Sequence, residues 1–218
     1  PVARRQETIR IRNPQGPVAT TDGVGGVRTV AIGDVGELGV LLPDEMLPLP
    51  RFLITPGGEE ILLRWTGQRA TIDAAMYLGF DQAGSLDDWE QIAGRLEVGA
   101  VNLVAADQRS IRYRVHADVP RRDGVRSGTQ PWKLMDGRDP RTLWTGQFLR
   151  DGELPYARDP ERGYLCTANN DPWGFTGDGR VDNDPFYYGN YFDPGDRAAR
   201  IEAELRRLIR EKPGRIDR

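Results

Sequence analysis

Residues 101–106 and 111–116, joined by a polar tetrapeptide, constrain the fold of this chain more than any other feature. Both stretches alternate with a period of two residues, which is the pattern of a half-buried β-strand because successive side chains point to opposite faces of a sheet. The four residues between them are turn-prone. The stretch therefore predicts an antiparallel β-hairpin, with Pro120, Arg121 and Arg122 shortly after its second strand.

Asn102 fits this hairpin poorly. Its carboxamide carries donors and acceptors, yet its neighbours along the strand are Val, Leu and Ala. Burying an unpaired amide would cost ~1–3 kcal/mol. Either a partner inside the fold satisfies Asn102, or the side chain faces a site where its NH2 group is useful, and the pattern leaves both alternatives open.

The rest of the chain predicts short strands, a few helices and long connections, which is an α+β pattern. Further strands are expected at residues 7–12, 27–32, 38–42, 59–66 and 163–168. Loops are expected at residues 13–26, in the proline-rich stretch 43–56, in the long surface excursion 123–160 and in the sharp turn 169–172.

Three helices are expected. The first is short, at residues 72–80, and the second runs from Ser85 as N-cap to Leu96. An apolar stripe on the second helix predicts core packing rather than a ligand site; it consists of Leu86, Trp89, Ile92, Ala93 and Leu96. The third helix spans residues 195–212 and is amphipathic, through Ala198, Ile201, Leu205, Leu208 and Ile209. Pro213 and Gly214 are expected to stop it.

Charge and composition exclude several classes of function. The 30 Lys and Arg residues against 33 Asp and Glu residues leave no basic excess for a nucleic-acid partner. No apolar run reaches the ~20 residues of a membrane span, so no membrane partner is expected. One cysteine and one histidine allow neither an internal disulfide nor a Cys/His zinc site, and no GxGxxG motif is present.

The two single residues of reactive type are expected to be structural. His116 alternates with Val115 on a strand face among arginines and has no second site residue beside it, so a catalytic triad is not favoured. Cys166 lies in an apolar stretch, where a buried inert thiol is the common outcome.

An acidic cluster near the C-terminal end is the one candidate for a metal. It consists of Asp178, Asp182, Asn183 and Asp184, whose oxygens suit calcium. The spacing does not match an EF-hand loop, so a solvated turn is the favoured interpretation.

Three stretches resemble the β chain of the penicillin amidase (penicillin acylase) family of N-terminal-nucleophile hydrolases. The first is ILLRWTG at 61–67, and the second is DDWEQIAGRL followed by the hairpin VNLVAADQRSIRYRVHADVPRR. The third is ERGYLCTANNDPWG with YYGNYFDPGDRAARIEAELR after it. The resemblance is close over residues 59–210 and loose over 1–58, so residues 1–218 are expected to form a single segment from the interior of such a β chain.

The resemblance implies a fold, an activity and two site residues. The fold is an αββα sandwich of two antiparallel sheets between helical layers. The activity is hydrolysis of linear amide bonds, such as the bond that links the acyl side chain to a β-lactam. The nucleophile is a serine at the β-chain N-terminus. Asn102 corresponds to the family's oxyanion-stabilising asparagine, and Arg122 to an arginine of the site, with Arg121 as the competing choice.

The resemblance also sets expectations for partners. Pro1 is not a serine, so the nucleophile is expected outside this segment, which alone would be inactive. No cofactor is expected, because the family's calcium ligands lie mostly elsewhere. The expected partners are the α chain and the rest of the β chain, with a small N-acyl substrate. The isolated segment is expected to form a homodimer, and the parent to be periplasmic or secreted.

The alternative is a non-catalytic β-rich binding or scaffold module. Its ligand face would be lined by aromatic residues, namely Trp132, Trp144, Trp173, Tyr187, Tyr188 and Tyr191. In such a module Asn102 would be buried and paired within the sheet, whereas in an amidase it would face an open groove near Arg122.

Overall fold

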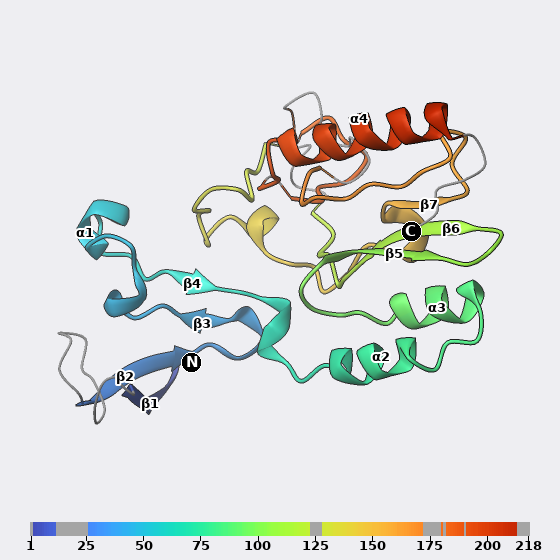
Figure 1. Ribbon diagram of the computed structural model, residues 1–218. Helices are drawn as coiled ribbons and strands as arrows, with labels where there is room; N and C mark the ends of the chain where they lie inside the picture. Colours follow the sequence, from blue (N-terminus) through green and yellow to red (C-terminus); the bar gives the residue numbers. More distant parts are fainter. Residues whose placement is uncertain are drawn as a thin grey trace. The chain divides into compact units, whose positions relative to one another are not determined.

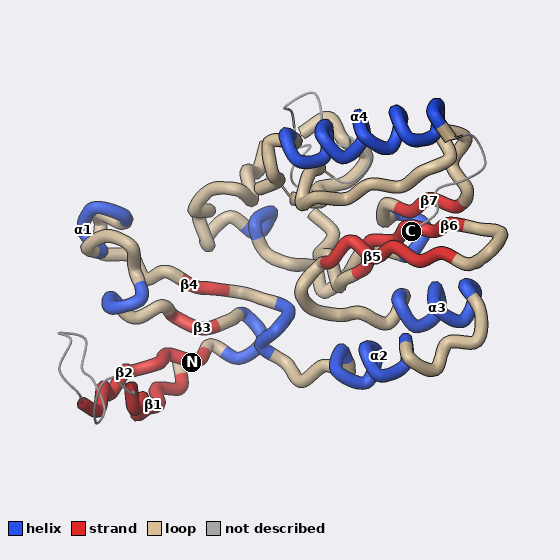
Figure 2. Tube along the Cα trace, viewed as in Figure 1, coloured by secondary structure: helices blue, strands red, loops and turns tan. Residues whose placement is uncertain are grey.

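The computed structural model describes residues 2–11, 26–122, 128–171, 180, 182–189 and 191–212. The chain divides into two compact units, Pro1–Arg69 and Ala70–Arg218. Both combine antiparallel strands with helices, as Figures 1 and 2 show, which confirms the expected α+β class. None of the helices in these ranges is both long and apolar enough to cross a membrane.

In the described part of the first unit, four strands form an antiparallel sheet in the order β1-β2-β3-β4. They are β1 Ala3–Ile11, β2 Gly26–Asp34, β3 Val40–Leu41 and β4 Leu62–Leu63. The 3₁₀ turn η1, Gly36–Leu38, connects β2 to β3. Gly39 has φ of 132°, and a Cβ there would lie 2.2 Å from the carbonyl oxygen of Leu63, so glycine allows β3 and β4 to pair.

Two predictions for this unit need correction. The strand expected at 59–66 is reduced to the two residues of β4, and Thr66–Gln68 forms the 3₁₀ turn η3. The extended connection expected at 43–56 contains the 3₁₀ turn η2, Asp44–Met46, and the helix α1, Arg51–Ile54. Pro43 directly precedes η2 and Pro50 directly precedes α1, a position at which proline is compatible with helix initiation.

The second unit begins with two helices, α2 Asp73–Phe80 and α3 Leu86–Ala93, close to the predicted positions. The Ser85 side chain accepts a hydrogen bond from the backbone N of Asp88 at 3.1 Å, which confirms the predicted N-cap. Ala93 and Leu96 are among the most buried residues of this unit. The apolar stripe of α3 is therefore core, as predicted.

The hairpin is present at the predicted residues and gains a third strand. β5 Val101–Ala106 pairs with β6 Ile111–His116, and β6 pairs with β7 Tyr156–Arg158. The turn is closed by Asp107, whose Oδ1 accepts hydrogen bonds from the backbone N atoms of Arg109 and Ser110 at 2.7 and 2.8 Å.

The two faces of this sheet differ in chemistry. Tyr113, Val115 and Ala157 form a buried cluster on one face, with Leu165 packed against it. By the alternation along β6, Arg112 and Arg114 lie on the opposite face, where Arg112 bonds to side chains of α3. Figure 1 shows α3 and α4 on opposite sides of the sheet.

The strand predicted at 163–168 is wrong. The third strand of the sheet is β7, which lies inside the stretch 123–160 that we expected to be a surface excursion. Residues 164–167 are irregular, and their apolar pattern reflects packing on the sheet. The three residues of β7 are too few to show the two-residue alternation of a strand. Residues 163–168 have an apolar pattern that resembles a strand, although they do not form one.

The last helix, α4 Asp196–Glu211, confirms the predicted amphipathic helix. It lies against the segment 162–169 through side-chain bonds: Arg206 Nε donates to the Tyr164 hydroxyl at 2.8 Å, and Arg197 donates to the Ala168 carbonyl oxygen at 2.8 Å. The expected stop at Pro213 and Gly214, and most of the loop 13–26, lie outside the described residues. The αββα sandwich stays a prediction.

Candidate functional site

Asn102 is the second residue of β5, which is an edge strand in the order β5-β6-β7. It lies opposite Val115 and shares its face with the buried cluster. The Asn102 side chain is half-buried, and its Oδ1 accepts a hydrogen bond from the Tyr113 hydroxyl at 2.6 Å. The fold therefore supplies a side-chain partner for the amide that the sequence left unexplained.

This bond uses only the oxygen end of the carboxamide. Within the described part of the chain it is the one side-chain hydrogen bond found for Asn102, and it involves no main-chain group. The Nδ2 group, with two N–H donors, remains available for another acceptor. Burial, together with the negative charge of Asp171, raises the pKa of Tyr113, which keeps its hydroxyl protonated and able to donate.

The two candidate arginines follow β6 and have different surroundings. Both oxygens of Glu153 accept hydrogen bonds from Arg121 Nη2, at 2.7 and 2.6 Å, and the Arg121 guanidinium lies 5.1 Å from the ring centre of Phe186. The Arg122 guanidinium lies 5.7 Å from the ring centre of Trp144. The chain leaves β6 at His116, which pairs with Val101, the neighbour of Asn102, and Arg121 and Arg122 follow within a few residues.

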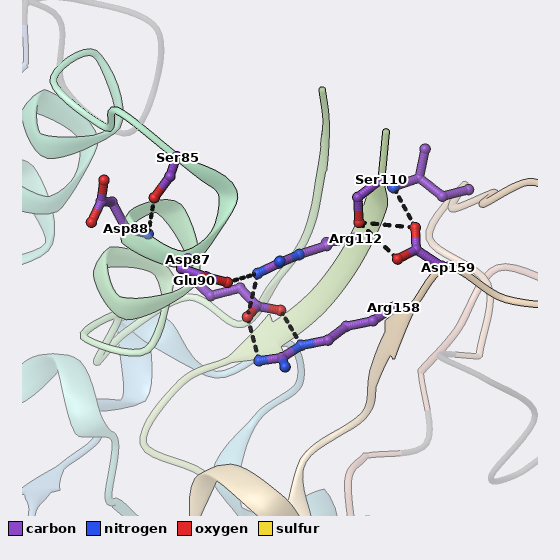
Figure 3. A network of polar contacts seen from close by, with 9 residues as sticks. Ser85, Asp87, Asp88, Glu90, Ser110, Arg112, Arg158 and Asp159 are labelled. Carbon is purple, nitrogen blue, oxygen red and sulfur yellow. Dashed lines mark hydrogen bonds and ion pairs between the residues drawn. The ribbon is translucent and has the colours of Figure 1, made fainter. Parts of the chain in front are cut away.

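On the opposite face of the sheet, Glu90 of α3 forms an ionic network that the sequence analysis missed (Figure 3). Glu90 is 6% exposed, and it accepts hydrogen bonds from Arg112 at 2.9 Å and from Arg158 at 3.0 and 2.5 Å. Arg112 also donates to Asp87 at 2.5 Å. The sequence did contain a signal for this network: Glu90 lies within the buried stripe of α3, and a buried carboxylate needs cationic partners.

His116 lies on this arginine face, as predicted. Its Nδ1 is 2.6 Å from the Leu96 carbonyl oxygen, and its Nε2 is 2.9 Å from Asp151, which also pairs with Arg114 at 2.7 Å. Burial acts to raise the pKa of Asp151, but the interactions with Arg114 and His116 outweigh it and leave that pKa lowered. Both ring nitrogens thus contact structural groups, on the face opposite Asn102.

The remaining candidates are the acidic cluster, the aromatic residues and Cys166. Asp178 and Trp173 lie outside them, and no group of three or more metal-binding side chains is found within them. Trp132 packs on Tyr187 with ring centres 5.9 Å apart. Cys166 is half-buried, burial raises its pKa, and it lies in the irregular segment instead of the expected strand.

Among known protein families, the family described as "Penicillin amidase" matches residues 1–217 of this chain. The match covers the first 58 residues as well, where the resemblance of short motifs is loose. It spans both compact units and every candidate residue described above.

Proposed function

Because the chain belongs to the penicillin amidase family, we propose that it forms part of a hydrolase that cleaves linear amide bonds of small N-acyl compounds. An example is the amide bond that links the acyl side chain to a β-lactam. In this proposal Asn102 stabilises the oxyanion of the tetrahedral intermediate. The nucleophile is the serine that the family resemblance implies at a β-chain N-terminus, outside residues 1–218.

The observation that carries the proposal is the state of the Asn102 carboxamide. Its oxygen is held by Tyr113, while its nitrogen is left with N–H donors on a half-buried edge strand. A preorganised N–H donor aimed at developing negative charge is the requirement of an oxyanion site. A binding or scaffold module predicts an Asn102 that is buried and paired within the sheet, whereas here the side chain is half-buried and, among the described residues, only its oxygen end has a partner on the neighbouring strand.

Arg122 is the arginine that we assign to the same site. Arg121 is committed to Glu153 through two hydrogen bonds, and both side chains are largely buried. The Arg122 guanidinium lies 5.7 Å from the ring centre of Trp144, a cation–π contact that helps to hold it in place. We therefore assign the site role that the family resemblance implies to Arg122, and a structural role to Arg121.

Replacing Asn102 in the full-length protein tests the proposal. Asn102→Ala should lower kcat for a chromogenic anilide by ~10²–10³, because one oxyanion donor is lost. The matched control is Gln108→Ala, which removes an exposed carboxamide from the turn of the same hairpin and should keep full activity. Circular dichroism verifies that both variants fold. A loss of activity below about tenfold in a folded Asn102→Ala protein would remove the oxyanion role.

A further inference from the structure

We propose that Tyr113 is a positioning residue, which fixes the Asn102 carboxamide so that its nitrogen faces the reacting substrate. The inference rests on the oxyanion role proposed for Asn102. It adds a residue that acts on the reaction through the amide that it holds.

The strand register brings the two side chains together. Asn102 pairs with Val115, and Val104 pairs with Tyr113, so Asn102 and Tyr113 are diagonal neighbours on one face. Diagonal neighbours in an antiparallel pair are within reach of an aromatic side chain. The hydroxyl spans this distance and donates to Asn102 Oδ1 at 2.6 Å, at the short end of the range for O–H···O bonds.

The two partners differ in how firmly the fold holds them. Tyr113 is 3% exposed, on the central strand of the sheet, and packs with Val115, Ala157 and Leu165. Asn102 is half-buried on the edge strand. The rigid tyrosine therefore orients the less constrained amide.

Orientation matters because the two ends of a carboxamide are alike in size and opposite in polarity. With the nitrogen outward, Asn102 donates to an oxyanion; with the oxygen outward, it would repel the same charge. The raised pKa of Tyr113 keeps the hydroxyl protonated, so it can donate to the oxygen end. The phenol thus favours the productive orientation.

A double-mutant cycle in the full-length protein tests this role. Tyr113→Phe keeps the ring in the core and removes the hydroxyl, so kcat should fall about tenfold with little change in KM, as expected for one lost hydrogen bond. In an Asn102→Ala background the same change should alter kcat less than about twofold, because no amide remains to be oriented.

Tyr164→Phe is the matched control. Tyr164 is 7% exposed, and its hydroxyl accepts a hydrogen bond from Arg206 at 2.8 Å, so this variant also loses a hydrogen bond at a buried tyrosine, away from Asn102. It should keep kcat within about twofold even if its thermal midpoint falls. Equal losses of kcat in the Tyr113 and Tyr164 variants would reveal a general structural effect and overturn the positioning role.

The cycle separates the two hypotheses. If Asn102→Ala is severely impaired but Tyr113→Phe is not, or if the two losses are additive, the positioning role fails and the oxyanion role stands. If Asn102→Ala retains activity, the oxyanion role fails and the positioning role falls with it. Non-additive losses confined to kcat support both.

Discussion

At the scale of single residues, Arg121 and Arg122 show how neighbouring identical side chains acquire different roles. The two leave the backbone in succession, and the fold offers a carboxylate and Phe186 to one and Trp144 to the other. Hydrogen bonds from Arg150 and then Arg121 lower the pKa of Glu153 to about 2. Glu153 therefore stays ionised below the pH at which an ordinary glutamate takes up a proton.

The lowered pKa of Glu153 makes a prediction about acid stability. Since the folded state binds the proton of Glu153 less readily than the unfolded state, this carboxylate stabilises the fold above its ordinary pKa of 4.5, and the contribution is lost as the pH falls toward about 2. Glu153→Gln should lower the thermal midpoint at pH 6 and make it fall less between pH 6 and pH 3. Glu161→Gln, at an exposed position, serves as the control and should follow the wild-type profile. A Glu153→Gln profile as steep as that of the wild type would contradict this assignment.

At the scale of secondary-structure elements, ionic contacts attach α3 to the sheet. Glu90 of α3 bonds to Arg112 of β6 and to Arg158 of β7, which are themselves paired across the two strands. Beside this network, Ser110 directly before β6 and Asp159 directly after β7 are also joined. Ser110 Oγ donates to the Asp159 carboxylate at 2.8 and 2.9 Å (Figure 3). The network on this face thus links α3 to β6 and β7, the two strands that carry Tyr113 and Ala157 on the other face.

Removing Glu90 should therefore destabilise the second unit. Glu90→Ala leaves Arg112 largely shielded from solvent without its buried partner, whereas Asp87→Asn removes an exposed one. We expect the drop in thermal midpoint for Glu90→Ala to be roughly two to three times as large as for Asp87→Asn. Equal drops would show that the buried carboxylate has no special part in attaching α3.

At the scale of the whole molecule, our proposal divides the reacting groups between residues 1–218 and the rest of a parent protein. In the proposed reaction Asn102 of the hairpin, positioned by Tyr113, acts on the oxyanion, and the serine nucleophile is proposed to lie outside residues 1–218. The first unit carries side chains more than half exposed, among them Met46, Phe52, Leu53 and Trp65. The α chain and the rest of the β chain stay the predicted partners.

If the nucleophile lies outside residues 1–218, these residues alone should not hydrolyse a phenylacetyl or aliphatic anilide. The reason is that an oxyanion-stabilising N–H donor cannot replace a nucleophile. The measurement is release of the chromophore, with the full-length protein as the positive control. Turnover by the isolated segment at a rate comparable to that of the full-length protein would show that the attacking group lies within it.

The elements with local signals could be predicted from the amino-acid sequence. The hairpin, the Ser85 cap and the helices α2, α3 and α4 follow from spacing within a few turns of chain, and all are present. Asn102 could be singled out for the same reason, since a carboxamide among apolar neighbours is a local inconsistency.

The contacts of those residues could be known only from the three-dimensional structure. Tyr113 as the partner of Asn102, Glu153 as the partner of Arg121 and β7 as the third strand depend on segments that are distant in sequence. Glu90 and Arg158 are 68 residues apart and meet because α3 and β7 both pack against β6. Periodicity reports which side of an element is buried, but it carries no information on which distant side chain will supply the opposite charge or the matching hydrogen bond.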